Sequence, residues 1–390
     1  MFSDYFHPEL GGIQDSIATT ARALGRRGHQ VDIHVPRYSR RDHALVGADP
    51  SAPPDLGAHV RVHRRASLPF PSSTRQSRAG LPSPLGWLRL RGAARPDLIH
   101  VQSFFGIGLE ALFDAALLGL KVIGTNHTTV AGFGPHLPVS VERAARFVMW
   151  FHNRCDHVTA PSRSVFAELG TSRLNRPLTV ISNPIDTALF APSPAARAAL
   201  RTRFGLAAPS IVFAGRLGAE KNIDVLLRAL ALLAGQGVAA ELLLAGHGAE
   251  AGALRALAAA LGITARVRFL GTLPQSELAA LLQAADVFAM PSTSETQSMA
   301  LLQAMAAGLP VVAVNARALP EYVTAEGGRL VPPGDPSALA AALRPLLENP
   351  ALAAELGSGG RRSSLAYGIE TVCDQWEILY EAVARGSVTK

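Results

Sequence analysis

Two short stretches of this sequence place charged side chains where they can bind a diphosphate. The first holds Arg216 and Lys221, and the second begins at Glu295. Each follows an apolar, strand-like run, at 211–214 and 287–290, and open α/β sheets bind ligands at the carboxyl ends of their strands. Alone, Arg216 and Lys221 would be ordinary solvated cations, and Glu295 would be an acid that favours a helix dipole. Together they favour a pocket in which fixed cations offset the charge that grows on a leaving diphosphate.

The residues after Glu295 are expected to extend this pocket. Residues 300–307 are a strong helix-forming run, which Gly308 and Pro310 end. The N–H groups at the start of such a helix attract phosphate oxygens. Glu295 can accept hydrogen bonds from sugar hydroxyls, and Gln303 is placed to reach ribose hydroxyls. The donor-binding residues predicted in this segment are Glu295, Thr296, Gln297, Ser298, Met299 and Gln303.

Further motifs extend over nearly the whole chain. In the second half they are Phe213-Ala214-Gly215-Arg216 with Lys221-Asn222, Pro291 to Glu295, and Ala304 to Val312. In the first half they are Ser3 to Pro8 with Gly11-Gly12, Gly124 to His127, Ala160 to Ser162, and Ser182 to Asp186. As a set they resemble the family 4 retaining glycosyltransferases of GT-B architecture, and the likeness is weak only between residues 40 and 95.

The resemblance implies roles for individual residues. Arg216 and Lys221 match the pair that binds the donor diphosphate, and Glu295 matches the acid that contacts the transferred sugar. Gly11 and Gly12 match a loop whose backbone closes over the donor.

His127 matches a family histidine near the reacting carbon. It follows the strand-like run 121–125, so its side chain is expected at the carboxyl end of a strand. The alternative is a histidine with a purely structural role.

Gln303 departs from the family pattern, which has a second glutamate eight positions after the first. An amide still offers an acceptor oxygen to a ribose hydroxyl, but it lacks the charge that strengthens such bonds. Weaker donor binding, or a protein without catalytic activity, would be the consequence.

The expected fold class is α/β, of the GT-B type, with two Rossmann-like domains whose mainly parallel sheets face across a cleft. Short apolar runs alternate with helical stretches, as in βαβ units, and 390 residues exceed what one core usually serves. Residues 1–188 are assigned to an acceptor-binding domain and 189–365 to a nucleotide-sugar-binding domain. Residues 366–390, part of a helical segment that starts at 361, are expected to cross back to the first domain. The alternative is that this segment packs in the core of the second domain.

The individual elements follow from the same patterns. The predicted strands are 31–35, 98–101, 121–125, 157–160, 178–181, 211–214, 241–245, 267–269, 287–290 and 311–314. The predicted helices include 13–27, 108–118, 141–153, 162–169, 223–233 and 254–261.

Composition bears on the cellular setting. Only Cys155 and Cys373 are present, without metal-ligand spacing, which favours a reduced cytoplasmic environment. No apolar run is long enough to span a membrane. Residues 1–4 are expected to be the end of a first strand, which family members begin several residues earlier, and the acids Asp4 and Glu9 argue against a signal peptide.

The formal net charge of +7 is concentrated in one segment. Residues 61–95 hold eight arginines and no acid, interleaved with leucines, Phe70 and Trp87. This composition suits an anionic membrane surface, and a position on the inner face of the cell membrane is expected. A solvated loop, or a site for an acidic ligand, is the alternative. No recognised nucleic-acid-binding motif accompanies the charge.

The resulting hypothesis is a hexose transfer from a nucleoside diphosphate sugar, with retention of configuration, to a lipid acceptor. No Asp-x-Asp motif occurs, so neither a metal ion nor another cofactor is expected, and the predicted catalytic residues are His127, Arg216, Lys221 and Glu295. A soluble transferase that makes a polysaccharide or a small glycoside is one alternative. A non-catalytic sugar-nucleotide-binding subunit is another.

Overall fold

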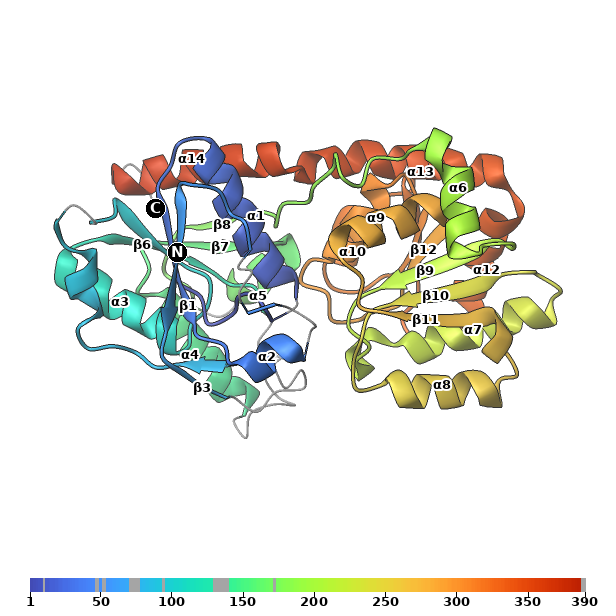
Figure 1. The fold of residues 1–390 in the computed structure, drawn as a ribbon, viewed down its shortest axis with the longest axis horizontal. Coiled ribbons are helices and arrows are strands. Elements are labelled where there is room, and N and C mark those ends of the chain that lie inside the picture. The colour runs from blue at the N-terminus through green and yellow to red at the C-terminus, as the bar shows by residue number, and fades with distance from the viewer. Residues whose placement is uncertain are drawn as a thin grey trace. The chain divides into compact units, whose positions relative to one another are not determined.

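The computed structural model of the protein describes residues 1–9, 11–45, 49–50, 54–69, 78–92, 95–128, 140–170 and 173–386. The chain forms two compact units, Met1–Pro184 with Ile369–Lys390, and Ile185–Gly368 (Figure 1). The sequence interpretation placed these boundaries after residues 188 and 365. Each unit is described by itself.

The first unit is built on a parallel sheet. Its strands are β1 (Val31–Pro36), β2 (Val60–Arg65), β5 (Leu98–Val101), β6 (Lys121–Thr125), β7 (His157–Ala160) and β8 (Leu178–Val180). β2 pairs with β1, and the order continues β5-β6-β7-β8. Phe2 forms single parallel bridges to His34 of β1 and to Val101 of β5. The N-terminal residues therefore take the position of a central strand between β1 and β5.

Helices and a small hairpin surround this sheet. They are α1 (Gly12–Arg26), α2 (Arg40–Ala44), β3 (Ser67–Pro69), β4 (Arg78–Gly80), η1 (Gly86–Leu90), α3 (Gly106–Leu118), α4 (Val141–His152), α5 (Arg163–Gly170) and α14 (Ile369–Ala384). Gly119 caps the C-terminal end of α3, and its φ of 63° is a left-handed conformation that glycine adopts without strain.

The second unit contains six parallel strands. They are β9 (Ser210–Ala214), β10 (Glu241–Ala245), β11 (Val267–Gly271), β12 (Val287–Met290), β13 (Val311–Val314) and β14 (Gly328–Val331). The order in the sheet is β11-β10-β9-β12-β13-β14. Chain order therefore reverses between β9 and β12, and such a switch point is where doubly wound sheets bind ligands.

The strands of the second unit are almost wholly apolar because helices cover both faces of a parallel sheet. In Figure 1, α9 and α10 lie on one side of the sheet, and α7 and α8 lie on the other. The helices are α6 (Pro194–Phe204), η4 (Ala219–Lys221), α7 (Ile223–Gly235), α8 (Ala251–Ala260), η5 (Thr264–Arg266), α9 (Gln275–Ala284), α10 (Met299–Ala306), α11 (Leu319–Tyr322), α12 (Pro336–Glu348), α13 (Pro350–Ser364) and η6 (Leu365–Tyr367).

The C-terminal helix α14 belongs to the first unit. Its apolar face, which includes Val372 and Trp376, packs on Ile123 of β6 and on Ile181, which follows β8. The sequence favours a helical segment from residue 361 onward, but α13 ends at Ser364 and the chain is extended at Gly368, so α14 begins only at Ile369.

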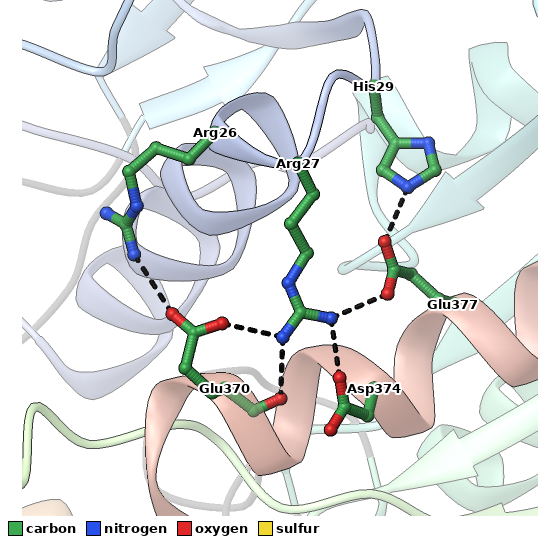
Figure 2. Close-up of polar contacts among 6 residues, drawn as sticks. All are labelled: Arg26, Arg27, His29, Glu370, Asp374 and Glu377. Carbon is green, nitrogen blue, oxygen red and sulfur yellow. Dashed lines mark hydrogen bonds and ion pairs between the residues drawn. The ribbon is translucent and has the colours of Figure 1, made fainter.

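A cluster of charged residues fastens α14 to the end of α1 (Figure 2). The two terminal nitrogens of Arg27 donate to Glu370 at 2.6 Å, Asp374 at 2.7 Å and Glu377 at 2.6 Å. His29 Nε2 lies 2.7 Å from the other carboxylate oxygen of Glu377. One guanidinium therefore contacts three acids on successive turns of α14.

Within the residues that the structure describes, no helix is both long and apolar enough to cross a membrane.

Candidate active site

Two loops lie together at the carboxyl edge of the second sheet. β9 and β12 are neighbouring parallel strands, so the loops 215–222 and 291–298 that follow them leave the sheet at the same edge. Asn222 joins these loops, because its Nδ2 donates to Thr293 Oγ1 at 3.0 Å and to the Pro291 carbonyl at 3.4 Å. The predicted diphosphate-binding residues therefore lie at the topological switch point.

The charged side chains in these loops form two ion pairs. Lys221 Nζ donates to Glu295 Oε1 at 2.6 Å, and the two side chains are 17% and 9% exposed. Arg216 Nη2 donates to Glu220 Oε1 at 2.7 Å in a more exposed pair. Burial alone would raise the pKa of Glu220, but the charges of Arg216 and Lys221 help to hold that pKa below its usual value. The two cations are thus balanced by two carboxylates, and an anionic ligand has to share the cations with those acids.

Glycine allows the loop after β10 to approach the loop after β9. Gly246 has a φ of 148°, and a Cβ on it would overlap the carbonyl oxygen of Gly215. A Cβ on Gly248 would overlap the backbone of Leu217, whose N–H donates to the His247 carbonyl at 3.0 Å. A side chain at either glycine would therefore displace the backbone that carries Arg216.

The start of α10 is fixed by its own cap. The Ser298 hydroxyl accepts from the Leu301 N–H at 3.3 Å, so this predicted donor-binding side chain serves as the N-cap. The N–H groups of Met299 and Ala300 come too early in the helix for an acceptor four residues back. They are suited to bind an anion together with Lys221.

Other predicted residues of this segment lie close to that cap. Thr296 is half-buried and Gln297 is buried, between Glu295 and Ser298. The Glu295 carbonyl accepts from the Ala318 N–H at 3.3 Å, which connects this loop to the segment after β13.

Gln303 is buried on α10 and faces the start of α9. Its Nε2 donates to Gln275 Oε1 at 3.1 Å. The position where the family has a glutamate is thus one half of a pair of amides, which has both donors and acceptors for a hydroxyl-bearing ligand.

Gly11 and Gly12 begin α1 in the first unit, and both are exposed. The Gly11 carbonyl accepts the first hydrogen bond of the helix, from the Asp15 N–H at 3.2 Å. This loop leaves the sheet on the same side as the ends of β1 and β5, because Phe2 runs parallel to both strands.

His127 lies after β6, in a small recess of the first unit. The recess is lined by Tyr5, Ile13, Gln102, Ser103, Phe104, Phe105, His127 and Thr128. His127 is 8% exposed, and its Nε2 lies 2.6 Å from Gln102 Oε1. Burial lowers the pKa of His127 to about 4, so the ring is neutral at physiological pH. A neutral imidazole can donate one hydrogen bond and accept another.

Gln102 is the residue of this recess that the sequence interpretation missed. It follows β5 directly, and β5 adjoins Phe2 at the point where the strand order of the first sheet reverses. The available signal was a polar residue immediately after a buried strand, whereas Arg216 and Glu295 follow their strands a few residues later.

The predicted site residues therefore fall into two groups. Arg216, Lys221 and Glu295 lie together in the second unit with the residues of α10, while His127 lies in the first unit with the Gly11-Gly12 loop. Within the described ranges, no group of three or more His, Cys, Asp or Glu residues is placed to hold a metal ion. Independence from metal ions stays a prediction.

Comparison with protein families matches both halves of the chain. Residues 10–189 match the model described as Glycosyltransferase Family 4, and residues 202–363 match the model described as Glycosyl transferases group 1.

Two curated relatives align over nearly the full length. A GDP-mannose-dependent alpha-mannosyltransferase of Mycolicibacterium smegmatis is 31% identical, over 98% of this chain and 96% of the relative. A GDP-mannose-dependent alpha-(1-6)-phosphatidylinositol monomannoside mannosyltransferase of Mycobacterium tuberculosis is 30% identical, over 95% of this chain and 92% of the relative.

Solved structures show the same fold. Sucrose-phosphate synthase from Thermosynechococcus elongatus superposes with a TM-score of 0.77 at 23% identity, over 96% of this chain and 94% of that one. Anabaena HepE in complex with UDP and glucose gives a TM-score of 0.77 at 21% identity, over 97% and 98% of the two chains. The expected fold class is confirmed.

Proposed function

This chain belongs to the family 4 glycosyltransferases of GT-B fold, and on that basis we propose that it transfers a hexose from a nucleoside diphosphate sugar to an acceptor hydroxyl with retention of configuration. The observation that carries the proposal is the pairing of Lys221 with Glu295 beside Arg216 at the switch point of the second sheet. Lys221 is a cation for the leaving group, and Glu295, which it contacts, is an acid for the sugar hydroxyls.

Cations and backbone N–H groups of the protein stabilise the charge of the leaving diphosphate. When the bond from the sugar C1 to the diphosphate oxygen breaks, negative charge grows on that oxygen. Arg216, Lys221 and the first N–H groups of α10 offset this charge without reorganisation of solvent. In this reaction the donor draws Lys221 toward its phosphates, and Glu295 is left to accept from the sugar hydroxyls. No divalent ion is required for these steps, and we propose a metal-independent reaction.

Retention requires the acceptor oxygen to bond to C1 from the side that the diphosphate leaves. The proton of the acceptor hydroxyl then passes to the departing phosphate oxygen, so that atoms and charge balance. His127, which is neutral because burial lowers its pKa, hydrogen-bonds to the transferred sugar in this proposal.

GDP-mannose is the donor that we propose to test first, because it is named for both full-length relatives. The experiment compares GDP-, UDP- and ADP-sugars for their effect on the thermal unfolding midpoint and for release of the nucleoside diphosphate. A donor that binds only the folded state raises the midpoint. A rise with one donor and its turnover would support the proposal, whereas a rise without transfer or hydrolysis for any acceptor would favour the non-catalytic alternative.

A lipid acceptor at a membrane surface is the second part of the proposal. One relative is named for a phosphatidylinositol monomannoside, and apolar side chains of the first unit are exposed on two adjoining elements. Leu85 precedes η1, Leu88 lies within it, and Phe113 and Leu117 lie on α3, which packs against η1. The cations Arg89 and Arg91 are in the same stretch. We propose that this surface, the η1–α3 face, meets anionic lipid on the inner side of the cell membrane.

Several arginines of the basic segment 61–95 are paired with acids of the same chain and are not available to a membrane surface. Arg61 pairs with Asp32 at 3.0 Å, Arg78 pairs with Asp42 at 2.9 Å, and Arg65 is buried against Glu110. These three charges are already balanced within the chain, which favours the soluble alternative. Arg75 and Phe70 lie outside the described residues.

Sedimentation with vesicles of anionic phospholipid tests the membrane contact. Wild-type protein should sediment at low salt and stay in the supernatant at high salt, and Leu88→Glu should weaken binding because a carboxylate opposes both burial and the anionic surface. Ile378→Glu on α14 is the matched control, since Ile378 is another exposed apolar residue of the same unit. Equal sedimentation of the wild type and both variants would contradict the η1–α3 face and favour a soluble acceptor.

A further inference from the structure

A series of hydrogen bonds between polar side chains runs from Tyr380 on α14 to His127. Tyr380 Oη lies 2.7 Å from His100 Nδ1, and Gln102 Nε2 lies 3.3 Å from that same nitrogen. The other end of the Gln102 amide, Oε1, lies 2.6 Å from His127 Nε2. His100, Gln102 and His127 are 2%, 6% and 8% exposed, so water does not compete strongly for these bonds.

The donor and acceptor roles of these groups set the direction of each hydrogen bond in the series. An amide nitrogen only donates, so the Gln102 Nε2–H group donates to His100 Nδ1, which must carry a lone pair. Burial keeps the pKa of His100 well below its usual value, and the neutral ring therefore has its proton on Nε2. That N–H donates to Thr125 Oγ1, 2.6 Å away.

The orientation of the amide then determines the state of His127. Gln102 Oε1 can only accept, so at 2.6 Å it accepts a hydrogen bond from the Nε2–H group of His127. The lone pair of the His127 ring is consequently on Nδ1. If Gln102 were reversed, its nitrogen would face His127 and its oxygen would face the lone pair of His100.

Neighbouring side chains hold His100 in the orientation that this series of hydrogen bonds requires. Its ring packs against Trp376 with centroids 4.7 Å apart, and against Tyr380 at 5.7 Å, both on α14. Thr125 Oγ1, its partner on the other side, is 2.6 Å from Thr159 Oγ1 on β7. The imidazole is thus held by two strands and the C-terminal helix, and it in turn orients the amide of Gln102.

We propose that Gln102 is a positioning residue for the transfer reaction, which fixes the ring of His127 and keeps its proton on Nε2. The inference rests on the proposed function, because it takes His127 to be the histidine that meets the transferred sugar. Gln102 acts through His127: a ring that rotated or changed tautomer would misplace its donor and acceptor by about an ångström, and misplacement of that size can cost about a hundredfold in rate.

The test compares Gln102→Met, which keeps the length of the side chain without its polar atoms, with Gln102→Glu, which keeps an acceptor for His127 Nε2–H. Two readouts are required. Long-range ¹H–¹⁵N spectra of protein labelled in histidine report the tautomer, with the His127 signals assigned by their loss in His127→Ala. Initial rates of GDP release from GDP-mannose give kcat and KM.

We expect Gln102→Met to change the tautomer signature of His127 and to lower kcat by about 10- to 100-fold, with little change in the KM for GDP-mannose. Gln102→Glu should keep the Nε2–H signature and recover part of kcat. Thr179→Val is the matched control, because it removes a hydrogen bond of 2.8 Å to another buried histidine of the unit, His157. This control should change stability but not kcat.

An unchanged His127 signature in Gln102→Met would overturn the inference, and so would a changed signature with wild-type kcat. Failure of the proposed function would look different: the wild type would not turn over GDP-mannose or any other sugar nucleotide, while the tautomer measurement would still decide whether Gln102 fixes the ring.

Discussion

At the scale of single residues, the candidate site holds its two cations in ion pairs. Lys221 contacts Glu295, and Arg216 contacts Glu220. The sequence placed these residues after two strands, but it did not predict these pairs. Spacing along a chain identifies residues at strand ends, whereas the pairing between Lys221 and Glu295 depends on two loops that are 74 residues apart.

Gln303 offers a direct test of donor recognition. We expect Gln303→Glu to tighten GDP-mannose binding by about three- to tenfold, because a carboxylate accepts stronger hydrogen bonds from ribose hydroxyls than an amide does. Gln275 can turn its amide nitrogen toward the new acid. Isothermal titration measures the change in Kd.

Gln283→Glu is the control for this change. Gln283 is also a glutamine of the second unit, and its Nε2 donates to the Ala191 carbonyl at 2.7 Å. The Gln283→Glu substitution adds the same negative charge away from the loops that follow β9 and β12. Equal affinity of both variants and the wild type would contradict the assignment of Gln303 to the donor pocket.

At the scale of elements, sequence patterns predicted the buried strands well. β5, β6, β7, β10, β12 and β13 begin and end at the predicted residues, because buried parallel strands are short apolar runs bounded by polar residues. β2 (Val60–Arg65) was missed because alternate positions are arginine or histidine. Arg61 and His63 are exposed and Arg65 is buried in an ion pair with Glu110, so the run lacks the continuous apolar pattern.

Contacts between distant elements were beyond prediction from the sequence. Gln102 becomes significant only because β5 and β6 pair and bring it beside His127. The attachment of α14 likewise depends on Arg27, which a sequence pattern treats as one more surface cation.

The cluster around Arg27 predicts a pH-dependent contribution to stability. Arg27→Ala should lower the free energy of unfolding by about 1 kcal/mol near neutral pH, a modest value because the acids are largely exposed. Hydrogen bonds from Arg27 and from His29 hold the pKa values of Glu370 and Glu377, respectively, below their usual value. A glutamate whose pKa is lower in the folded protein stabilises the fold fully at pH values above its pKa in the unfolded chain, about 4.3. This stabilisation is lost as the pH falls through the lower pKa of the folded protein.

Urea unfolding at a series of pH values measures this effect. The difference between the wild type and Arg27→Ala should shrink below about pH 4. Arg385→Ala, which removes an exposed pair with Glu381 on the same helix, should unfold like the wild type throughout. If the difference in unfolding free energy between the wild type and Arg27→Ala grew on acidification, the ionised carboxylates would not be the source of the stabilisation by Arg27.

At the scale of the whole molecule, two α/β units each place polar residues at the carboxyl edge of a sheet where strand order reverses. The resemblance to GT-B enzymes predicted this duplication, and the solved structures confirm the fold. The acceptor could not be predicted, because the segment expected to meet it, residues 61–95, has the weakest family likeness and balances several of its arginines internally.

Independence from metal ions is a property of the complete enzyme. With protein cations and the α10 N-terminus to neutralise the diphosphate, turnover of GDP-mannose should be the same in excess EDTA as in buffer with Mg²⁺. Loss of activity in EDTA that returns with Mg²⁺ or Mn²⁺ would contradict this prediction.

The central claim is that side-chain cations of the second unit stabilise the leaving diphosphate, and kcat/KM of Arg216→Ala for GDP-mannose tests it most directly. Arg344→Ala is the matched control, because Arg344 pairs with Glu348 at the same four-residue spacing and at similar exposure. The account predicts a fall of about 100- to 1000-fold for Arg216→Ala and none for Arg344→Ala. Equal values for the wild type and both variants would contradict it.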